Sequence, residues 1–200
     1  SSGIHPLHAD GAWDWVSVKE AAKDEKCVAW GELGLDNHYP EPKLALQEKL
    51  LEEHLAIIEG EKDDQRPVIV HCRKAVEELL PIFNSSSISN TRFVFHCFTE
   101  SEAEAKQIIE FGARISFTGV VTYKNAPQVL AAAELVPIDS IMIETDAPYL
   151  SPEPVRKIRP NEPKFVVHTA AHLAAKFKMT FSEFERQTDQ NATHFFKLDR

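Results

Sequence analysis

The chain has 200 residues, of which 43% are hydrophobic and 26% are charged, a composition typical of one globular domain with a sizeable core over residues 1–200. Its 31 acidic and 22 basic residues give a formal charge of −9, which argues against a broad basic face for nucleic acid but allows a local phosphate site. No apolar run approaches the roughly 18 residues that span a membrane, and the three cysteines form no CxxC pair, so we expect a soluble, cytoplasmic protein.

Five short apolar runs, rich in Val, Ile or Phe, alternate with helical patterns along the chain. The runs cover 27–36, 67–72, 92–98, 113–119 and 140–146, and they are typical of buried parallel strands. Helices are expected over 44–59, 101–111, 127–135, 163–177 and 181–197. Capping boxes at Ser101–Glu104 and Thr180–Glu183 support two of these helices. The repeated order of strand and helix predicts an α/β fold with a parallel sheet.

Polar side chains fall at, or just after, the carboxyl ends of four of these runs, namely Glu32, His71, His96 and Asp146. An open doubly wound sheet and a closed (β/α)₈ barrel both fit the order of elements, but barrel enzymes place their chemistry at this end of their strands. One such histidine would more often be a hydrogen-bonded core residue. Because four such residues each follow a different strand, the pattern favours a shared metal site in a barrel.

Two histidines with two carboxylates suit zinc, manganese or iron, whereas ligand sets made only of oxygen favour magnesium or calcium. Such an ion lowers the pKa of a bound water, and the resulting hydroxide can attack an ester or an amide. The sequence has no Gly-rich phosphate loop and no GxSxG elbow. Cys72 and Cys97 directly follow two of the histidines, so strand alternation predicts that they face the opposite way and serve in packing. Metal-dependent hydrolysis is therefore the expected reaction class.

The segments "GIHP", "GELGLD", "PVIVHCRKA", "FVFHCF", "ISFTGVVTYK" and "IETDAPYL" follow one another along the chain. In this order they resemble the TatD-like deoxyribonuclease family, and the similarity continues through "RPNEPKFV" and "QNATHFFKL" over essentially the whole chain. The resemblance implies a TIM barrel, a pair of divalent ions whose type (zinc, manganese or magnesium) stays open, and hydrolysis of DNA phosphodiester bonds by an exonuclease.

The same resemblance implies a role for each residue of the proposed site. Glu32 would bridge two metal ions, and His71 and His96 would be ligands of one of them. Asp146 would hold the other ion and the attacking water, so that Asp146 and Glu32 would be the catalytic residues.

Other residues of these motifs are candidates for supporting roles. Arg73 matches a position that the family uses near phosphate, for which a planar guanidinium is suited, although a surface salt bridge is the alternative. His5 matches a residue that lines the family's site and would contact substrate. Asp36 and His38 could hydrogen-bond behind the ligands or be solvated, and Glu144 is expected to support a ligand through a hydrogen bond.

A basic cluster follows Asp146 and consists of Arg156, Lys157, Arg159 and Lys164. In a barrel this loop would overhang the site, where it could collect DNA backbone phosphates. A solvated charged loop without a partner is an equal alternative.

The chain departs from the family pattern at its start, because it contains no "HxH" pair. Five runs and the stub before His5 make six strands, whereas a complete barrel has eight and about 250 residues. We therefore expect a barrel without its first two β/α units, which could associate with itself or with an N-terminal completing segment. Two alternatives to an active nuclease stay open: an inactive or partner-completed barrel remnant, and an amidohydrolase acting on a C–N bond.

Overall fold

A five-stranded parallel sheet organises the computed structural model, which describes residues 1–198. Its strands are β1 (Trp30–Asp36), β2 (Val68–Arg73), β3 (Phe93–Phe95), β4 (Arg114–Phe117) and β5 (Ile141–Ile143). The strands lie side by side in chain order, each parallel to the next. A doubly wound sheet reverses its strand order at a switch point, whereas a barrel does not. The consecutive order therefore confirms a parallel α/β fold of the barrel-like kind.

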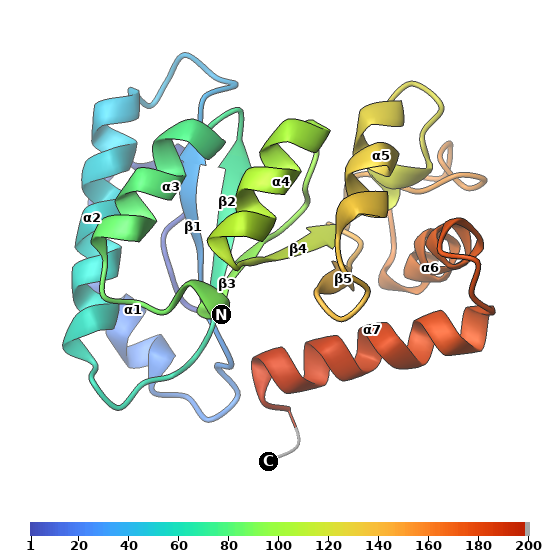
Figure 1. Cartoon of the computed structure of the whole chain (residues 1–200). Coiled ribbons are helices and arrows are strands. Elements are labelled where there is room, and N and C mark those ends of the chain that lie inside the picture. The colour runs from blue at the N-terminus through green and yellow to red at the C-terminus, as the bar shows by residue number, and fades with distance from the viewer. Residues whose placement is uncertain (199–200) are drawn as a thin grey trace.

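Among residues 1–198, seven helices accompany the sheet. They are α1 (Trp15–Ala22), α2 (Leu44–Gly60), α3 (Val76–Ser85), α4 (Glu102–Phe111), α5 (Pro127–Leu135), α6 (Val166–Lys176) and α7 (Phe181–Phe196). Short 3₁₀ turns are η1 (Pro6–His8), η2 (Asn90–Arg92), η3 (Gly119–Thr122) and η4 (Pro163–Phe165). Helices α2 to α5 pack on one face of the sheet, whereas the end of α7 packs on the other. Helices α3 and α4 lie in front of the strands, α2 stands at the left edge and α5 toward the right, and α7 crosses below them (Figure 1). None of the helices in residues 1–198 combines the length and apolar character needed to cross a membrane.

The predicted helices are confirmed, including both capping boxes. Helices α1 and α3 were not predicted. Pro81 lies inside α3, where it lacks the N–H that would bond the carbonyl four residues earlier. The helix persists because one of its faces is buried, with Val76, Leu79 and Phe83 in the core.

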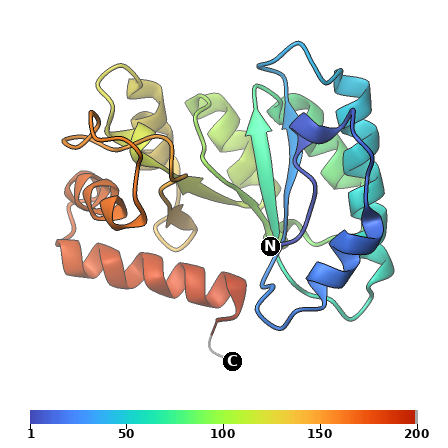
Figure 2. The ribbon, with the colours of Figure 1, turned by 180° about the vertical axis from the view of Figure 1, so that it is seen from behind.

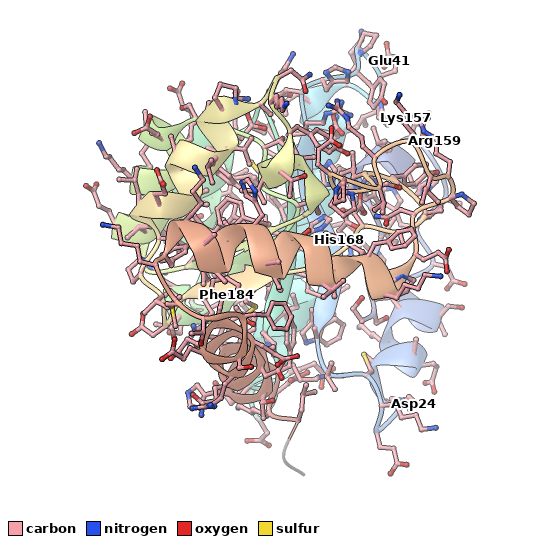
Figure 3. The ribbon with its side chains drawn as sticks, turned by 90° about the vertical axis from the view of Figure 1, so that its right-hand side faces the viewer. Asp24, Glu41, Lys157, Arg159, His168 and Phe184 are labelled. Atoms are coloured by element: carbon pink, nitrogen blue, oxygen red, sulfur yellow. The ribbon has the colours of Figure 1, made fainter. Side chains whose placement is uncertain are left out.

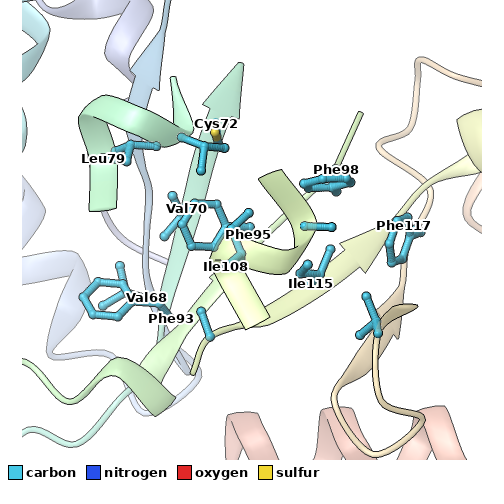
Figure 4. Close-up of a cluster of buried hydrophobic side chains, with 14 of the residues drawn as sticks. Val68, Val70, Cys72, Leu79, Phe93, Phe95, Phe98, Ile108, Ile115 and Phe117 are labelled. Carbon is cyan, nitrogen blue, oxygen red and sulfur yellow. The ribbon is translucent and has the colours of Figure 1, made fainter. Parts of the chain in front are cut away.

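The main core lies between the sheet and these helices, and aromatic rings fill much of it (Figure 4). Phe83 of α3 stacks on Phe93 of β3 with 4.4 Å between ring centroids, and both are fully buried. Along β2 the burial alternates, so that Cys72 faces this core while His71 and Arg73 are partly exposed on the other face. The packing role predicted for Cys72 is thus confirmed.

The second face of the sheet is visible from behind (Figure 2). It borders a cavity of about 390 Å³ that also touches α6 and α7, and the end of α7 packs on this face through Phe195 against Val94 and Met142. Beside β1, Ser2 forms a parallel bridge with Trp30. The stub before His5 therefore meets the sheet through one bridge only, short of the sixth strand that was predicted.

Candidate metal centre

Strand β1 can lie very close to β2 because it contains glycine. Gly34 has φ +147°, and a Cβ at that position would lie 1.9 Å from the carbonyl oxygen of His71, which only glycine avoids. The register of β1 against β2 also slips between Trp30 and Leu33. The motif "GELGLD" therefore brings the carboxylates of Glu32 and Asp36 against β2.

One carboxylate oxygen forms the centre of the site. Glu32 Oε1 lies 2.7 Å from His71 Nδ1, 2.5 Å from His96 Nε2 and 3.3 Å from His5 Nε2. These residues come from β1, from β2, from the turn after β3 and from the segment before η1. Three of the four strand-end residues are thus brought into direct contact.

Each of the two strand-end histidines has a second carboxylate behind it. His71 Nε2 lies 3.0 Å from Oδ2 of Asp36, whose side chain is 1% exposed. An ionised carboxylate only accepts, so Asp36 holds a proton on Nε2 of His71 and leaves Nδ1, which now hydrogen-bonds to Glu32, as the nitrogen that could bind a metal in place of that hydrogen bond. His96 Nδ1 lies 3.5 Å from Glu144, whose other oxygen accepts from the backbone N–H of Cys97 at 2.8 Å. Histidine ligands of metals are oriented in this way, by a carboxylate on the far nitrogen.

His5 has the opposite tautomer. Its Nδ1 accepts from the backbone N–H of Leu7 at 3.1 Å, so the ring proton sits on Nε2, the atom that faces Glu32 and His71. The ligand atoms of His5, Glu32 and His71 lie within 4.8 Å of one another, as a metal site would require. His96 Nε2 also contacts Glu32, with Glu144 on its far nitrogen, so His96 is an alternative third ligand, in which case His5 is placed to donate a hydrogen bond.

The charges of the site are strongly coupled. Burial opposes ionisation of Glu32, but hydrogen bonds from His5, His71 and His96 outweigh it and hold the pKa of Glu32 well below its usual range. Burial disfavours a charged His96, but Glu144 and Glu32 outweigh it and raise the pKa of His96 to about 10. The protein thus places a positive charge among these carboxylates, which is the charge that a divalent cation would provide.

All six predicted site residues line one cavity of about 690 Å³: His5, Glu32, His71, Arg73, His96 and Asp146. Asp146 follows β5 in a left-handed conformation, with φ +53°. Burial and the charges of Glu144 and Glu32 raise the pKa of Asp146, although His96 opposes them. Arg73 lies over the ring of Tyr39, with its Cζ 5.3 Å from the ring centroid.

The prediction that Cys97 faces away from the site was wrong. Strand β3 ends at Phe95, and Cys97 has φ +47°, so the alternation of an extended strand no longer applies. Its Sγ lies 3.9 Å from Asp146 and 3.8 Å from Thr118, on the cavity wall. Burial and the nearby charges of Asp146 and Glu144 raise the pKa of the Cys97 thiol, which argues against a thiolate nucleophile.

The basic cluster does not line this cavity. Arg156, Lys157 and Arg159 line a separate surface groove with Glu153 and Pro154. The guanidinium of Arg156 lies 3.7 Å from the centre of the Tyr123 ring. Lys157 and Arg159 project from the loop on the same side of the view as Glu41 (Figure 3). Lys164 pairs with Glu162 at 2.8 Å.

His38 also stays outside the cavity lining. Its ring packs against Tyr39, with 4.8 Å between centroids, and its backbone N–H donates to Asp36 at 2.9 Å. Of Asp36 and His38, only Asp36 therefore hydrogen-bonds behind a proposed metal ligand.

Sequence reasoning missed three residues around the site. Tyr39 and Tyr149 line the cavity, and each stands three residues after a site carboxylate, Asp36 or Asp146. His54 of α2 is 1% exposed and accepts from the N–H of Ile4 at 2.9 Å, directly before His5. The spacing after the carboxylates was a usable signal for the tyrosines, whereas the contact of His54 depends on tertiary structure.

A family model described as "TatD related DNase" matches residues 1–197. The "Uncharacterized metal-dependent hydrolase YcfH" of Escherichia coli K12 is 36% identical over 200 residues, which are 100% of this chain and 74% of that protein. The "3'-5' ssDNA/RNA exonuclease TatD" of Musicola paradisiaca is 33% identical, over 99% of this chain and 76% of that protein.

A solved structure is also similar. The crystal structure of YJJV, a TatD homologue from Escherichia coli K12, superposes with a TM-score of 0.88 at 25% sequence identity. The match covers 98% of this chain and 76% of that chain.

Proposed function

The chain belongs to the TatD family of metal-dependent hydrolases, and from that premise we propose that it hydrolyses the phosphodiester bonds of DNA from a strand end. The observation that carries the proposal is the shared oxygen of Glu32, with His71 and His96 turned toward it and a carboxylate behind each ring. The 3' end is the proposed starting point, since the Musicola relative is named a 3'-5' exonuclease.

Glu32, His71 and His96 would hold one divalent ion, since both histidines contact the same oxygen of Glu32. His5, whose ligand atom lies within 4.8 Å of those of Glu32 and His71, is the alternative third ligand. Imidazole with carboxylate favours zinc, manganese or iron over magnesium. When bound, such an ion polarises a phosphoryl oxygen and lowers the pKa of a water. The ligands of the family's second ion would include Asp146, together with an "HxH" pair that these 200 residues lack.

The chain's own residues would perform the remaining tasks of hydrolysis. Asp146 orients the attacking water and accepts its proton, for which a carboxylate with a raised pKa is suited. Arg73 binds the phosphate on the same cavity wall, and His5 donates from Nε2 to a substrate oxygen. Water adds to phosphorus, the bond from phosphorus to the 3' oxygen breaks, and that oxygen takes up a proton.

The sheet would form an arc of a (β/α)₈ barrel. Among residues 1–198, β5 pairs only with β4, and the Ser2 bridge extends β1 by a single pair. Two further β/α units would close the ring between these edges and contribute the "HxH" pair. This segment could be supplied by the same polypeptide or by another chain, and self-association is the alternative way to cover the edges.

A partner-completed barrel is therefore the second candidate function, in which this chain alone is inactive. A cytoplasmic location is also proposed, because all three cysteines are free thiols.

The test is digestion of a single-stranded oligonucleotide, labelled at its 5' end, by metal-stripped protein to which manganese, zinc or magnesium is returned. We expect progressive shortening from the 3' end that chelator abolishes. Glu32→Gln and Asp146→Asn should lose the activity while keeping the circular dichroism spectrum. Digestion at the parental rate by either variant would contradict the assigned roles. Activity that appears only after an "HxH" segment is added would support the partner-completed form.

A further inference from the structure

Two exposed tyrosines line the cavity that contains the proposed metal centre. Tyr39 is 47% exposed and Tyr149 is 69% exposed, and both are among the lining residues. A single exposed aromatic residue is ordinary on a protein surface. Two on one cavity, which Glu32 and Asp146 also line, place accessible aromatic surface beside the proposed metal centre, where a bound substrate would lie.

The backbone of Tyr149 is firmly held although its ring is exposed. Its N–H donates to the carbonyl of Asp146 at 2.9 Å, and its carbonyl accepts from the side chain of Asn161 at 2.5 Å. Asn161 is 3% exposed and also binds the carbonyl of Thr145 at 2.8 Å. The turn from Asp146 to Tyr149 is therefore fixed, and a ring carried by a fixed turn needs little ordering before it binds a ligand.

Tyr39 is held by side-chain contacts with His38 and Arg73. The N–H of His38 donates to Asp36 at 2.9 Å, and the His38 ring packs edge-on against Tyr39. The guanidinium of Arg73 lies 5.3 Å from the centre of the Tyr39 ring. A positive charge and an aromatic face thus occur together on the cavity wall.

We propose that Tyr39 and Tyr149 are base-binding residues, which stack on the unpaired nucleobases beside the phosphodiester held at the metal centre. This inference rests on the proposed function and adds to it the origin of substrate choice. Aromatic faces next to a cationic group bind single strands without reading sequence, since every base has a π face. Bases within a duplex are already paired and stacked, so the two tyrosines select strands with unpaired ends, in DNA and RNA alike.

The experiment measures binding rather than turnover. A 5'-fluorescent single-stranded oligonucleotide and the same strand with abasic 3'-terminal residues are titrated with the protein in chelator, where no hydrolysis occurs. We expect the intact strand to bind more tightly. Tyr149→Ala and Tyr39→Ala should each weaken binding of the intact strand about tenfold and leave the abasic strand unchanged. Tyr149→Phe and Tyr39→Phe, which retain the ring, should bind as the parent does.

Phe181→Ala is the matched control, because Phe181 is 37% exposed but lines another cavity. It should leave both affinities unchanged. Equal losses on intact and abasic strands, no loss in the alanine variants, or no binding of either strand by the parent would overturn the inference. Metal-dependent digestion of both strands at the same rate would refute base stacking but support the proposed nuclease activity. Tighter binding of the intact strand without any hydrolysis would support base stacking but refute the nuclease activity.

Discussion

Asp36→Asn should reverse the tautomer of His71 and weaken the metal centre. In the parent, one oxygen of Asp36 accepts from the N–H of His38 at 2.9 Å and the other faces His71 Nε2 at 3.0 Å. Asparagine has only one oxygen. If that oxygen keeps its bond to His38, the amide N–H₂ faces His71 Nε2 and makes it the acceptor, so the ring proton moves to Nδ1 and occupies the lone pair that points at Glu32.

The expected loss of metal affinity is about 10- to 100-fold, as for other residues that orient metal ligands. This corresponds to about 1.4–2.7 kcal/mol, which agrees with about 1.5–3 kcal/mol for a hydrogen bond to a charged group. The assay is titration of metal-stripped protein with zinc in competition with a chromophoric chelator.

His38→Ala is the control, because it retains the backbone N–H that contacts Asp36 and removes only a side chain that does not line the cavity. It should bind zinc as the parent does. Parental affinity in Asp36→Asn, with an unchanged fold, would refute the reasoning that Asp36 fixes the tautomer of His71.

Three further predictions follow from other parts of the molecule. Burial lowers the pKa of His54 from 6.5 to about 4 in the folded protein, so the unfolded chain takes up the proton first as the pH falls. The stability of the parent should therefore decrease by up to about 3 kcal/mol between pH 6.5 and pH 4 relative to His54→Gln, and denaturant titrations with no such difference would exclude this role. Arg73→Ala should weaken binding of a single-stranded oligonucleotide about tenfold without changing zinc affinity, because its proposed partner is phosphate; a parallel loss of zinc would indicate a structural role instead. Phe83→Ala should lower the free energy of unfolding by about 3–5 kcal/mol, since it empties a fully buried site between α3 and β3, and a loss below about 1 kcal/mol in urea titrations would mean that the core collapses around the gap.

Strand periodicity was enough to predict the parallel sheet and the joint cavity of Glu32, His71, His96 and Asp146. A parallel sheet brings the carboxyl ends of its strands together, so residues far apart in the chain converge there. The same periodicity failed for Cys97, because it holds only while the backbone is extended, and Cys97 follows the strand with positive φ.

Tertiary contacts determine two features that the local sequence pattern does not predict, namely helix α3 and the protonation of the site histidines. Helix α3 tolerates Pro81 because its apolar face is buried. The tautomers of His5 and His71 are set by Leu7 and Asp36, and these contacts are visible only when the loops are folded. The sequence predicted which residues meet, but their hydrogen-bond partners determine which of them can bind a metal.

Anomalous diffraction from zinc-soaked crystals tests the central claim most directly. We expect a peak at ligand distance, about 2.0–2.2 Å, from Glu32, His71 Nδ1 and His96 Nε2. A peak coordinated by His5 in place of His96, or no peak between these side chains, would contradict it.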